Sequence, residues 1–228
     1  MDVKSKKLKT VIVIPAFNEA GTVGQAVKSV EGYGDVVVVD DGSSDDTSAK
    51  AGEAGAIVLR QPVNMGVGFT TRTGIGFALK KLFPDVIVTF DADGQHPAEE
   101  IEAMLDKIRE DYEVVFTNRL GDVKQMPFTK RIGNKLLSLT TNLIAGSNVT
   151  DSQCGLRAFT PQAYRRFRFT ADDYSFVSEL VYEASRTNSR CVEIGIPSIY
   201  HPGRGYRGTD IITGVKIFFK TLLLRLRK

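Results

Sequence analysis

The chain has 228 residues and a mass of 25.0 kDa, which suits one large domain or a domain with a small appendage. Its 42% hydrophobic and 25% charged residues are ordinary for a globular protein with a core of normal size. The net charge of +3 excludes little, but basic residues gather within residues 1–10 and 201–228. An anionic surface or ligand is therefore expected near the two ends.

Targeting signals and membrane spans are absent from the pattern. The apolar run at 11–16 is too short for a signal peptide, and no uncharged apolar run approaches the roughly 20 residues that cross a bilayer. Cys154 and Cys191 lie far apart and have no metal-type spacing, so we expect reduced thiols in a cytosolic protein. We expect no nucleic-acid partner, and a homodimer stays open.

Short apolar runs alternate with helical patterns along most of the chain. Strands are predicted at 11–14, 36–39, 56–59, 86–90 and 114–117, and helices at 22–31, 47–54, 69–82, 97–110 and 130–143. Strands that alternate with helices form right-handed βαβ units, which predicts an α/β fold with a mostly parallel sheet.

Three polar clusters directly follow predicted strands, at 15–19, 40–45 and 91–95. Ligands of such sheets bind beyond the carboxyl ends of the strands. Asp40 or Asp41 is expected to accept hydrogen bonds from a base or a ribose, and spacing does not decide between them. The competing interpretation is turn chemistry alone.

The central cluster predicts a divalent metal site. Asp91 and Asp93 stand at positions i and i+2 of an extended chain, so their carboxylates can aim at one point, and Gln95 adds an oxygen. Oxygen ligands suit Mg²⁺ or Mn²⁺ together with substrate phosphates. An ordinary acidic turn is the alternative.

Arg119 follows the next predicted strand, where it would face the substrate phosphates.

The C-terminal segment has the pattern of a basic amphipathic helix. One face carries Ile211, Val215, Phe218, Leu222 and Leu226, reinforced by Ile212, Phe219 and Leu223, and the other carries Thr213, Lys216, Lys220 and Arg227. Such a helix is typical of a membrane interface, although packing on its own domain or on a second copy fits as well. We therefore divide the chain into a catalytic domain at 1–208 and a membrane-associating helix at 209–228.

Several segments together resemble the family 2 glycosyltransferases of GT-A fold, and more narrowly the dolichyl- or polyprenyl-phosphate mannose and glucose synthases. The segments are VIVIPAFNEA, VVVVDDGSSDDT, NMGVGFTTRTG, VTFDADGQHP, TNR and TDSQCGLRAF. Each motif alone is unspecific, but the motifs together in this order are specific for the family. The resemblance runs from Val11 to about Pro202.

The resemblance implies a role for each matching residue. Pro15, Phe17, Glu19 and one of Asp40 and Asp41 would hold the nucleoside; Asp91, Ala92, Asp93 and Gln95 the diphosphate and metal; Arg119, Arg131, Arg204 and Arg207 the phosphates. Residues 151–157 would form the acceptor loop. The implied catalytic residues are Asp93, Arg119, Arg131, Asp151 and Glu179.

The expected reaction is inverting, metal-dependent transfer of a hexose from GDP-mannose or UDP-glucose to a polyprenyl phosphate, on the cytoplasmic face of a membrane. An acceptor phosphate is already an anion, whereas a saccharide acceptor, which is the alternative, needs a base such as Asp151 or Glu179. A sugar-nucleotide pyrophosphorylase is disfavoured because PAFNEA replaces its glycine-rich basic loop. A non-catalytic module that only binds membranes is disfavoured because the Asp91-Ala92-Asp93 motif (the DxD motif) is intact.

Overall fold

A computed structural model describes residues 7–119, 128–197 and 211–224. Within these ranges, seven strands form one sheet in the order β3-β2-β1-β4-β6-β5-β7. The strands are β1 (Thr10–Ala16), β2 (Asp35–Asp40), β3 (Ile57–Arg60), β4 (Val86–Thr89), β5 (Val114–Asn118), β6 (Arg157–Phe159) and β7 (Cys191–Gly195). Only β6 among them runs antiparallel to its neighbours, β4 and β5. The predicted α/β fold with a mostly parallel sheet is confirmed.

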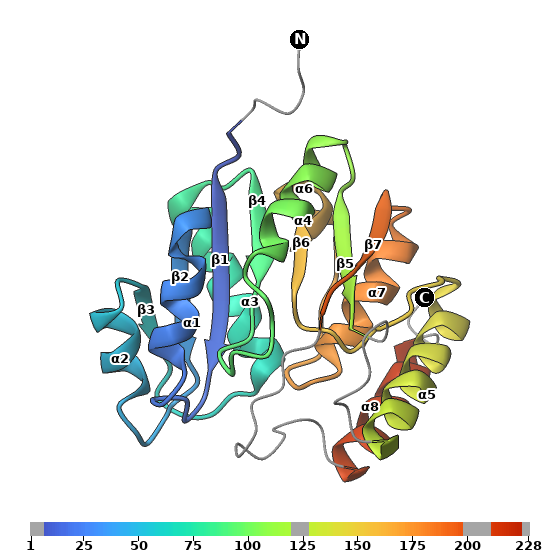
Figure 1. The fold of residues 1–228 in the computed structure, drawn as a ribbon. Helices are drawn as coiled ribbons and strands as arrows, with labels where there is room; N and C mark the ends of the chain where they lie inside the picture. Colours follow the sequence, from blue (N-terminus) through green and yellow to red (C-terminus); the bar gives the residue numbers. More distant parts are fainter. Residues whose placement is uncertain (1–6, 120–127, 198–210, 225–228) are drawn as a thin grey trace.

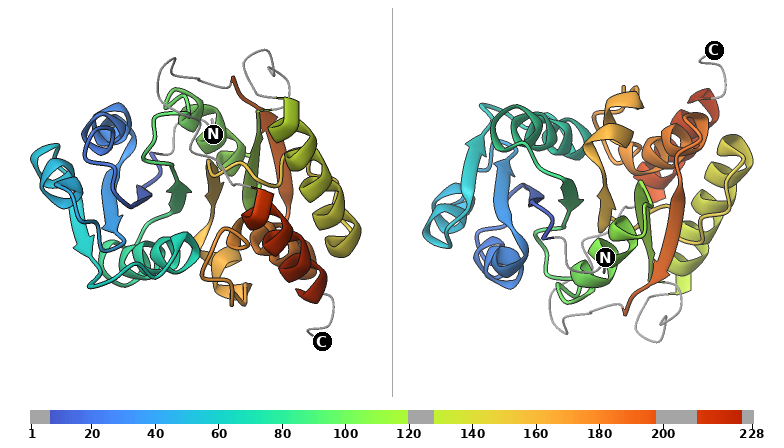
Figure 2. Two further views of the ribbon diagram at one scale, coloured as in Figure 1. Left: turned by 90° about the horizontal axis from the view of Figure 1, so that it is seen from below. Right: turned by 90° about the horizontal axis from the view of Figure 1, so that it is seen from above.

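Helices cover both faces of the sheet (Figures 1 and 2). On one face α1 (Val23–Val30), α2 (Thr47–Glu53) and α4 (Glu100–Arg109) pack against the even residues of β1, Ile12 and Ile14. On the other, α3 (Val67–Phe77), α6 (Pro161–Arg166) and α7 (Phe176–Arg186) pack against Val11 and Val13. Both faces of β1 are thus buried, which explains its continuous apolar run.

Two helices, α5 (Phe128–Ala145) and α8 (Ile211–Leu224), lie side by side beyond α7, at lower right in Figure 1. Two short turns complete the list, a 3₁₀ turn η2 (Glu31–Tyr33) and a π-helical turn η3 (Ala78–Leu82) that continues α3. Within the ranges that the model describes, no helix combines the length and apolarity needed to cross a bilayer.

Helix α8 packs on its own domain, but only part of its apolar surface is buried there. Ile217 and Thr221 are 1% exposed and make its buried side, while Val215, Phe219, Leu222 and Leu223 are exposed. Helix α8 therefore packs on α5 and α7 through a narrow strip and leaves much of its apolar face uncovered. The proposed domain boundary at 208/209 falls outside the described residues.

Candidate active site

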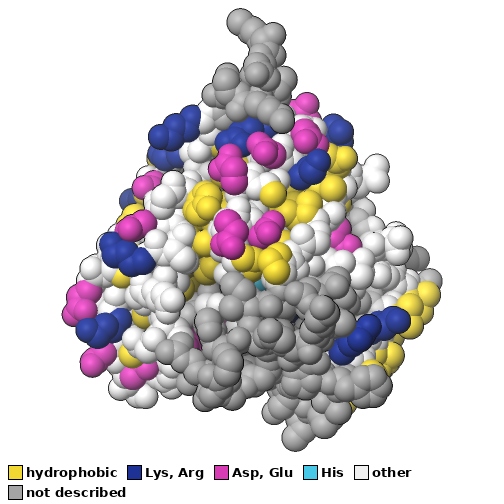
Figure 3. All heavy atoms as spheres, viewed as in Figure 1, with side chains coloured by type: hydrophobic (Ala, Val, Ile, Leu, Met, Phe, Trp, Pro, Cys, Tyr) yellow, Lys and Arg dark blue, Asp and Glu magenta, His cyan; other side chains and the backbone are white. Residues whose placement is uncertain are grey.

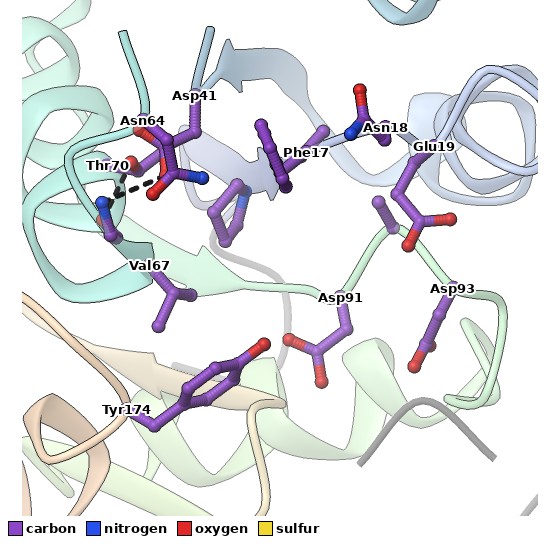
Figure 4. A pocket seen from close by; sticks show the side chains of 14 residues that line it. Phe17, Asn18, Glu19, Asp41, Asn64, Val67, Thr70, Asp91, Asp93 and Tyr174 are labelled. Atoms are coloured by element: carbon purple, nitrogen blue, oxygen red, sulfur yellow. Dashed lines mark hydrogen bonds between the residues drawn. The ribbon is translucent and has the colours of Figure 1, made fainter. Parts of the chain in front are cut away.

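A cavity of about 600 Å³ opens at the carboxyl ends of β1, β2 and β4 (Figure 4). All three polar clusters after the predicted strands contribute to it. Its lining consists of Pro15, Ala16, Phe17, Asn18, Glu19, Asp41, Asn64, Gly66, Val67, Thr70, Asp91, Ala92, Asp93 and Tyr174. Among the implied substrate residues, Pro15, Phe17 and Glu19 thus share one cavity with the DxD motif.

The structure distinguishes the two adjacent aspartates. Asp41 lines the cavity, and its carboxylate accepts hydrogen bonds from the backbone N–H groups of Met65, at 2.7 Å, and Gly66, at 3.0 Å. Asp40 is fully buried in the turn, where it accepts from the N–H of Ser43 at 2.8 Å and from Ser48. Asp40 therefore shapes the turn, which favours Asp41 as the aspartate that would contact the nucleoside; that contact stays a prediction.

The loop that follows β4 presents Asp91 and Asp93 at the opposite side of the cavity from Asp41 (Figure 4). Asp91 accepts a hydrogen bond at 2.7 Å from Nε2 of His96, whose side chain is only 1% exposed. A Cβ atom on Gly155 would lie 2.4 Å from each Asp91 carboxylate oxygen, so the backbone at Gly155 closes tightly around this carboxylate.

The two carboxylates titrate differently because their surroundings differ. Burial and the negative charge of Asp91 raise the pKa of Asp93 to about 6. Burial also opposes ionisation of Asp91, but the His96 hydrogen bond and the charges of His96, Arg119 and Arg157 outweigh it and lower its pKa. Near pH 7 both groups are mainly anionic at close quarters, which is unfavourable until a cation joins them.

These residues fit Mg²⁺ or Mn²⁺ bound jointly with a substrate. The described part of the chain has no group of three His, Cys, Asp or Glu side chains arranged for a metal. Two carboxylates completed by substrate phosphates are nevertheless a usual set for Mg²⁺. The backbone N–H of Gln95 donates to Asp93 at 2.9 Å, while its own side chain as a ligand stays a prediction.

Arg119 and Asp151 form a buried ion pair next to the site. Nε of Arg119 lies 2.9 Å from Oδ2 of Asp151, and the two residues are 8% and 1% exposed. Arg119 is close enough to Asp91 to lower its pKa. Asp151 also accepts from the N–H of Gln153 at 3.1 Å, so both of its oxygens have partners within the protein, and its catalytic role stays a prediction.

Glu179 has a structural role. It is 1% exposed, and its carboxylate accepts hydrogen bonds from the N–H groups of Thr170, at 3.0 Å, and Ala171, at 2.8 Å, and from the Thr170 hydroxyl at 2.9 Å. The carboxylate does not line the cavity. Both carboxylate oxygens therefore bind the segment before α7, and the role of Glu179 as a base for a saccharide acceptor stays a prediction.

Of the remaining predicted phosphate contacts, the structure describes only Arg131. Arg131 is exposed in the first turns of α5 and does not line the cavity, and Arg204 and Arg207 lie outside the described residues. The cavity lining also contains residues for which no individual role was predicted: Asn18 of the 15–19 cluster, Asn64, Val67 and Thr70 of the NMGVGFTTRTG segment, and Tyr174. Tyr174 lies in the segment just before α7, and no pattern in the sequence indicated it as a cavity residue.

Residues 11–171 match the family model described as glycosyl transferase family 2. The chain belongs to the family 2 glycosyltransferases. This glycosyltransferase is 34% identical over 242 residues to the UDP-N-acetylglucosamine–dolichyl-phosphate N-acetylglucosaminyltransferase of Methanococcus voltae, covering 95% of this chain and 96% of the relative. It is 28% identical to the dolichyl-phosphate hexose transferase of Haloferax volcanii, covering 93% and 91%.

Solved structures agree with the GT-A-like fold. Glucosyl-3-phosphoglycerate synthase from Mycobacterium tuberculosis, crystallised with phosphoglyceric acid, superposes with a TM-score of 0.76 at 19% identity, over 98% of this chain and 81% of that one. The same enzyme with Mn²⁺, uridine diphosphate and phosphoglyceric acid gives a TM-score of 0.74 at 18% identity, over 98% and 80%. At this identity the likeness establishes the fold alone.

Proposed function

We propose that this glycosyltransferase moves a hexose or N-acetylhexosamine from a nucleoside diphosphate to a polyprenyl phosphate, with inversion at the anomeric carbon. The observation that carries the donor half is a single cavity with Asp41 on one side and Asp91 and Asp93 on the other. Asp41 is suited to bind a nucleoside, and Asp91 with Asp93 is suited to bind a diphosphate through a metal ion.

The bond changes define what the residues must do. The bond between the anomeric carbon and the diphosphate oxygen breaks, and an acceptor phosphate oxygen forms a new bond on the opposite face. Asp91 and Asp93 would hold Mg²⁺ or Mn²⁺, which supplies positive charge to the leaving diphosphate. His96 and the backbone of Gly155 fix Asp91, and Arg119 adds positive charge nearby.

The acceptor half rests on two observations. First, both carboxylates that could have activated a sugar hydroxyl, Asp151 and Glu179, are engaged with other groups. A lipid phosphate, already an anion, requires no such base. Second, the relatives from Methanococcus voltae and Haloferax volcanii carry dolichyl phosphate in their names.

A surface for the lipid bilayer lies on α5 and α8. We define the interfacial face by its exposed apolar residues, which are Ile132, Leu136, Leu139, Leu143, Val215, Phe219, Leu222 and Leu223. Basic Arg131, Lys135 and Lys216 are exposed on the same two helices. Hydrophobic and basic side chains lie together over α5 in Figure 3. Exposed apolar residues beside basic ones are typical of peripheral membrane binding, and the free thiols Cys154 and Cys191 fit the cytoplasmic side.

The test is a transfer assay with the full chain, a short polyprenyl phosphate and Mn²⁺ or Mg²⁺. GDP-mannose, UDP-glucose and UDP-N-acetylglucosamine are compared as donors. We expect lipid-linked sugar from one donor, with the anomeric configuration inverted by NMR, and loss of product in Asp93→Ala. Asp46→Ala is the matched control, because Asp46 is an exposed carboxylate at the same end of the sheet outside the cavity lining.

Three kinds of outcome would contradict different parts of the proposal. Donor hydrolysis without lipid product, or transfer to a saccharide, would keep the donor half and overturn the acceptor. Retention of the anomeric configuration would overturn the inversion. Absence of turnover with every donor and metal would overturn the reaction itself.

A further inference from the structure

The segment between α6 and α7, residues 170–174, contacts three parts of the molecule. Its start is fixed by Glu179, which accepts from the N–H groups of Thr170 and Ala171. Glu179 is buried, so these hydrogen bonds are shielded from water. The backbone of this segment is therefore held firmly at the point where it turns toward the cavity.

The middle of the segment packs directly on the amino end of α3. The carbonyl of Asp172 accepts from the N–H groups of Gly68, at 2.8 Å, and Phe69, at 3.1 Å, and its carboxylate pairs with Arg72. A Cβ atom on Gly66 would lie 2.5 Å from the Asp172 carbonyl oxygen. Gly66 also donates to Asp41, so the segment shares one glycine with the nucleoside side of the cavity.

The end of the segment places Tyr174 in the cavity wall. Its side chain extends toward Asp91 from the opposite wall (Figure 4), and the residue is 51% exposed. No described residue accepts a hydrogen bond from its hydroxyl. The phenol hydroxyl carries one proton, which it can donate to an anion bound in the cavity.

The neighbouring residue connects this segment to α8. Oδ2 of Asp173 accepts a hydrogen bond at 2.6 Å from Nζ of Lys220, and Oδ1 accepts from the N–H of Ser175 at 3.0 Å. Burial alone would raise the pKa of Asp173, but the hydrogen bonds from Lys220 and Ser175 outweigh it and lower the pKa. Asp173 is thus a carboxylate held between α8 and the start of α7, directly before Tyr174.

We propose that the Tyr174 hydroxyl donates a hydrogen bond to the donor's diphosphate, and that Lys220 of α8 is a positioning residue that acts on Tyr174 through Asp173. A helix that carries part of the interfacial face would then also help to shape the donor site. This inference rests on the proposed donor half of the reaction, and it is independent of the acceptor.

The first experiment measures binding of UDP and GDP to the full chain by calorimetry in the presence of Mn²⁺, with UMP and GMP for comparison. Tyr174→Phe removes only the hydroxyl. We expect it to weaken diphosphate binding at least about 5-fold, as for a lost hydrogen bond to a charged group, and to change monophosphate binding much less. Thermal unfolding of the same variant should match that of the native chain.

The second experiment separates positioning from general charge. Lys220→Gln and Lys216→Gln each remove one exposed lysine from α8, so both should lose vesicle binding equally. Only Lys220→Gln is expected to weaken diphosphate binding, by about 2- to 5-fold, since a partly exposed ion pair contributes modestly. In the Tyr174→Phe background the Lys220→Gln effect should disappear, because the two changes act through one contact.

Several results would overturn the inference. Diphosphate binding that is indifferent to Tyr174→Phe removes the proposed contact. An undiminished Lys220→Gln effect in the Tyr174→Phe background, or equal effects of the two lysine variants on diphosphate binding, removes the positioning role. A native chain that binds neither diphosphate overturns both the inference and the donor half of the proposed function. Failure with the lipid acceptor alone leaves the inference intact.

Discussion

At the level of single residues, Asp93 is a carboxylate whose ionisation is unfavourable in the metal-free protein. Its pKa of about 6 in the folded chain lies above the ordinary value of 3.8. Between these two values the folded state binds the proton more tightly than the unfolded state does. The contribution of Asp93 to stability therefore falls as the pH rises from about 4 to about 6, and it stays unfavourable above that.

Asp93→Asn should accordingly stabilise the metal-free protein at pH 8, by about 1–2 kcal/mol after allowance for solvent screening. The difference from the native chain should shrink toward pH 4, where Asp93 is protonated in both states. Urea unfolding with a chelator at pH 5 and pH 8 measures it. Mn²⁺ with a nucleoside diphosphate should stabilise the native chain and leave the variant unchanged. A variant less stable than the native chain at pH 8 would contradict the conclusion that the ionised Asp93 carboxylate beside Asp91 destabilises the metal-free protein.

Gly155 is the second residue with a sharply testable role. Thr89 donates a hydrogen bond at 2.6 Å to its carbonyl oxygen, which holds the backbone in place while it closes on Asp91. The Cβ atom of Gly155→Ala would lie 2.4 Å from both carboxylate oxygens, a distance that forces the carboxylate to move. Because the atoms displaced are the end of one side chain, the metal site should suffer more than the fold.

We therefore expect Gly155→Ala to weaken Mn²⁺-dependent nucleotide binding by about 10-fold or more with a small change in thermal stability. Gly76→Ala in α3 is the matched control, since no atom lies within 4 Å of its added Cβ. Alanine there should be neutral or stabilising by up to about 1 kcal/mol. Native-like metal-dependent binding in Gly155→Ala would show that Asp91 is not confined by this backbone.

At the level of elements, the interfacial face is expected to determine membrane binding. Leu139 and Leu143 of α5 are 65% and 76% exposed, so replacing both by serine costs the fold little. We expect the double variant to bind anionic vesicles about 10-fold more weakly or worse, from the apolar area lost. Phe83→Ser is the control, because Phe83 is 72% exposed on the turn after η3, away from this face. Equal losses in the two variants would argue against a specific face.

The sequence predicted those elements whose patterns are local. The apolar runs at 11–14, 36–39 and 114–117 became β1, β2 and β5, because each is buried on both faces and must be apolar throughout. The segment Arg157–Phe159 carried no such signal. It became β6 because it fits between β4 and β5, with the buried Arg157 donating to the carbonyls of Ser152, Cys154 and Val177. A three-residue strand that begins with a charged residue is determined by its tertiary contacts, which a local sequence pattern does not reveal.

For the candidate site, the sequence predicted which clusters meet but not which individual side chains make the contacts. The clusters at 15–19 and 91–95 were expected to meet because the carboxyl ends of parallel strands share one edge. The choice of Asp41 over Asp40 depends on which carboxylate meets the N–H groups at Met65 and Gly66, and spacing carries no information about that. The contacts of Glu179 with the N–H groups of Thr170 and Ala171 were not predicted, because the sequence does not distinguish a carboxylate that binds backbone N–H groups from a catalytic one.

At the level of the whole molecule, the cavity and the interfacial face lie toward the same end of the sheet. The cavity is at the carboxyl ends of β1, β2 and β4, and in Figure 1 α5 and α8 occupy the same lower side. The loop between α4 and β5, which contains Glu110, lies at the other end, because it precedes the start of β5. A bilayer against α5 and α8 would therefore lie beside the cavity entrance and far from Glu110.

This arrangement predicts an orientation on membranes. With Cys191→Ser as the background, an environment-sensitive dye is attached to Leu143→Cys or to Glu110→Cys; Cys154 is fully buried and its pKa is raised, so it should not react. Anionic vesicles should shift the emission of the Leu143→Cys dye to the blue and leave the Glu110→Cys dye unchanged. High salt should reverse the shift in part, since basic residues share the face. Equal shifts at both positions would mean that the protein binds membranes without a preferred face, and the cavity would then have no fixed position relative to the lipid acceptor.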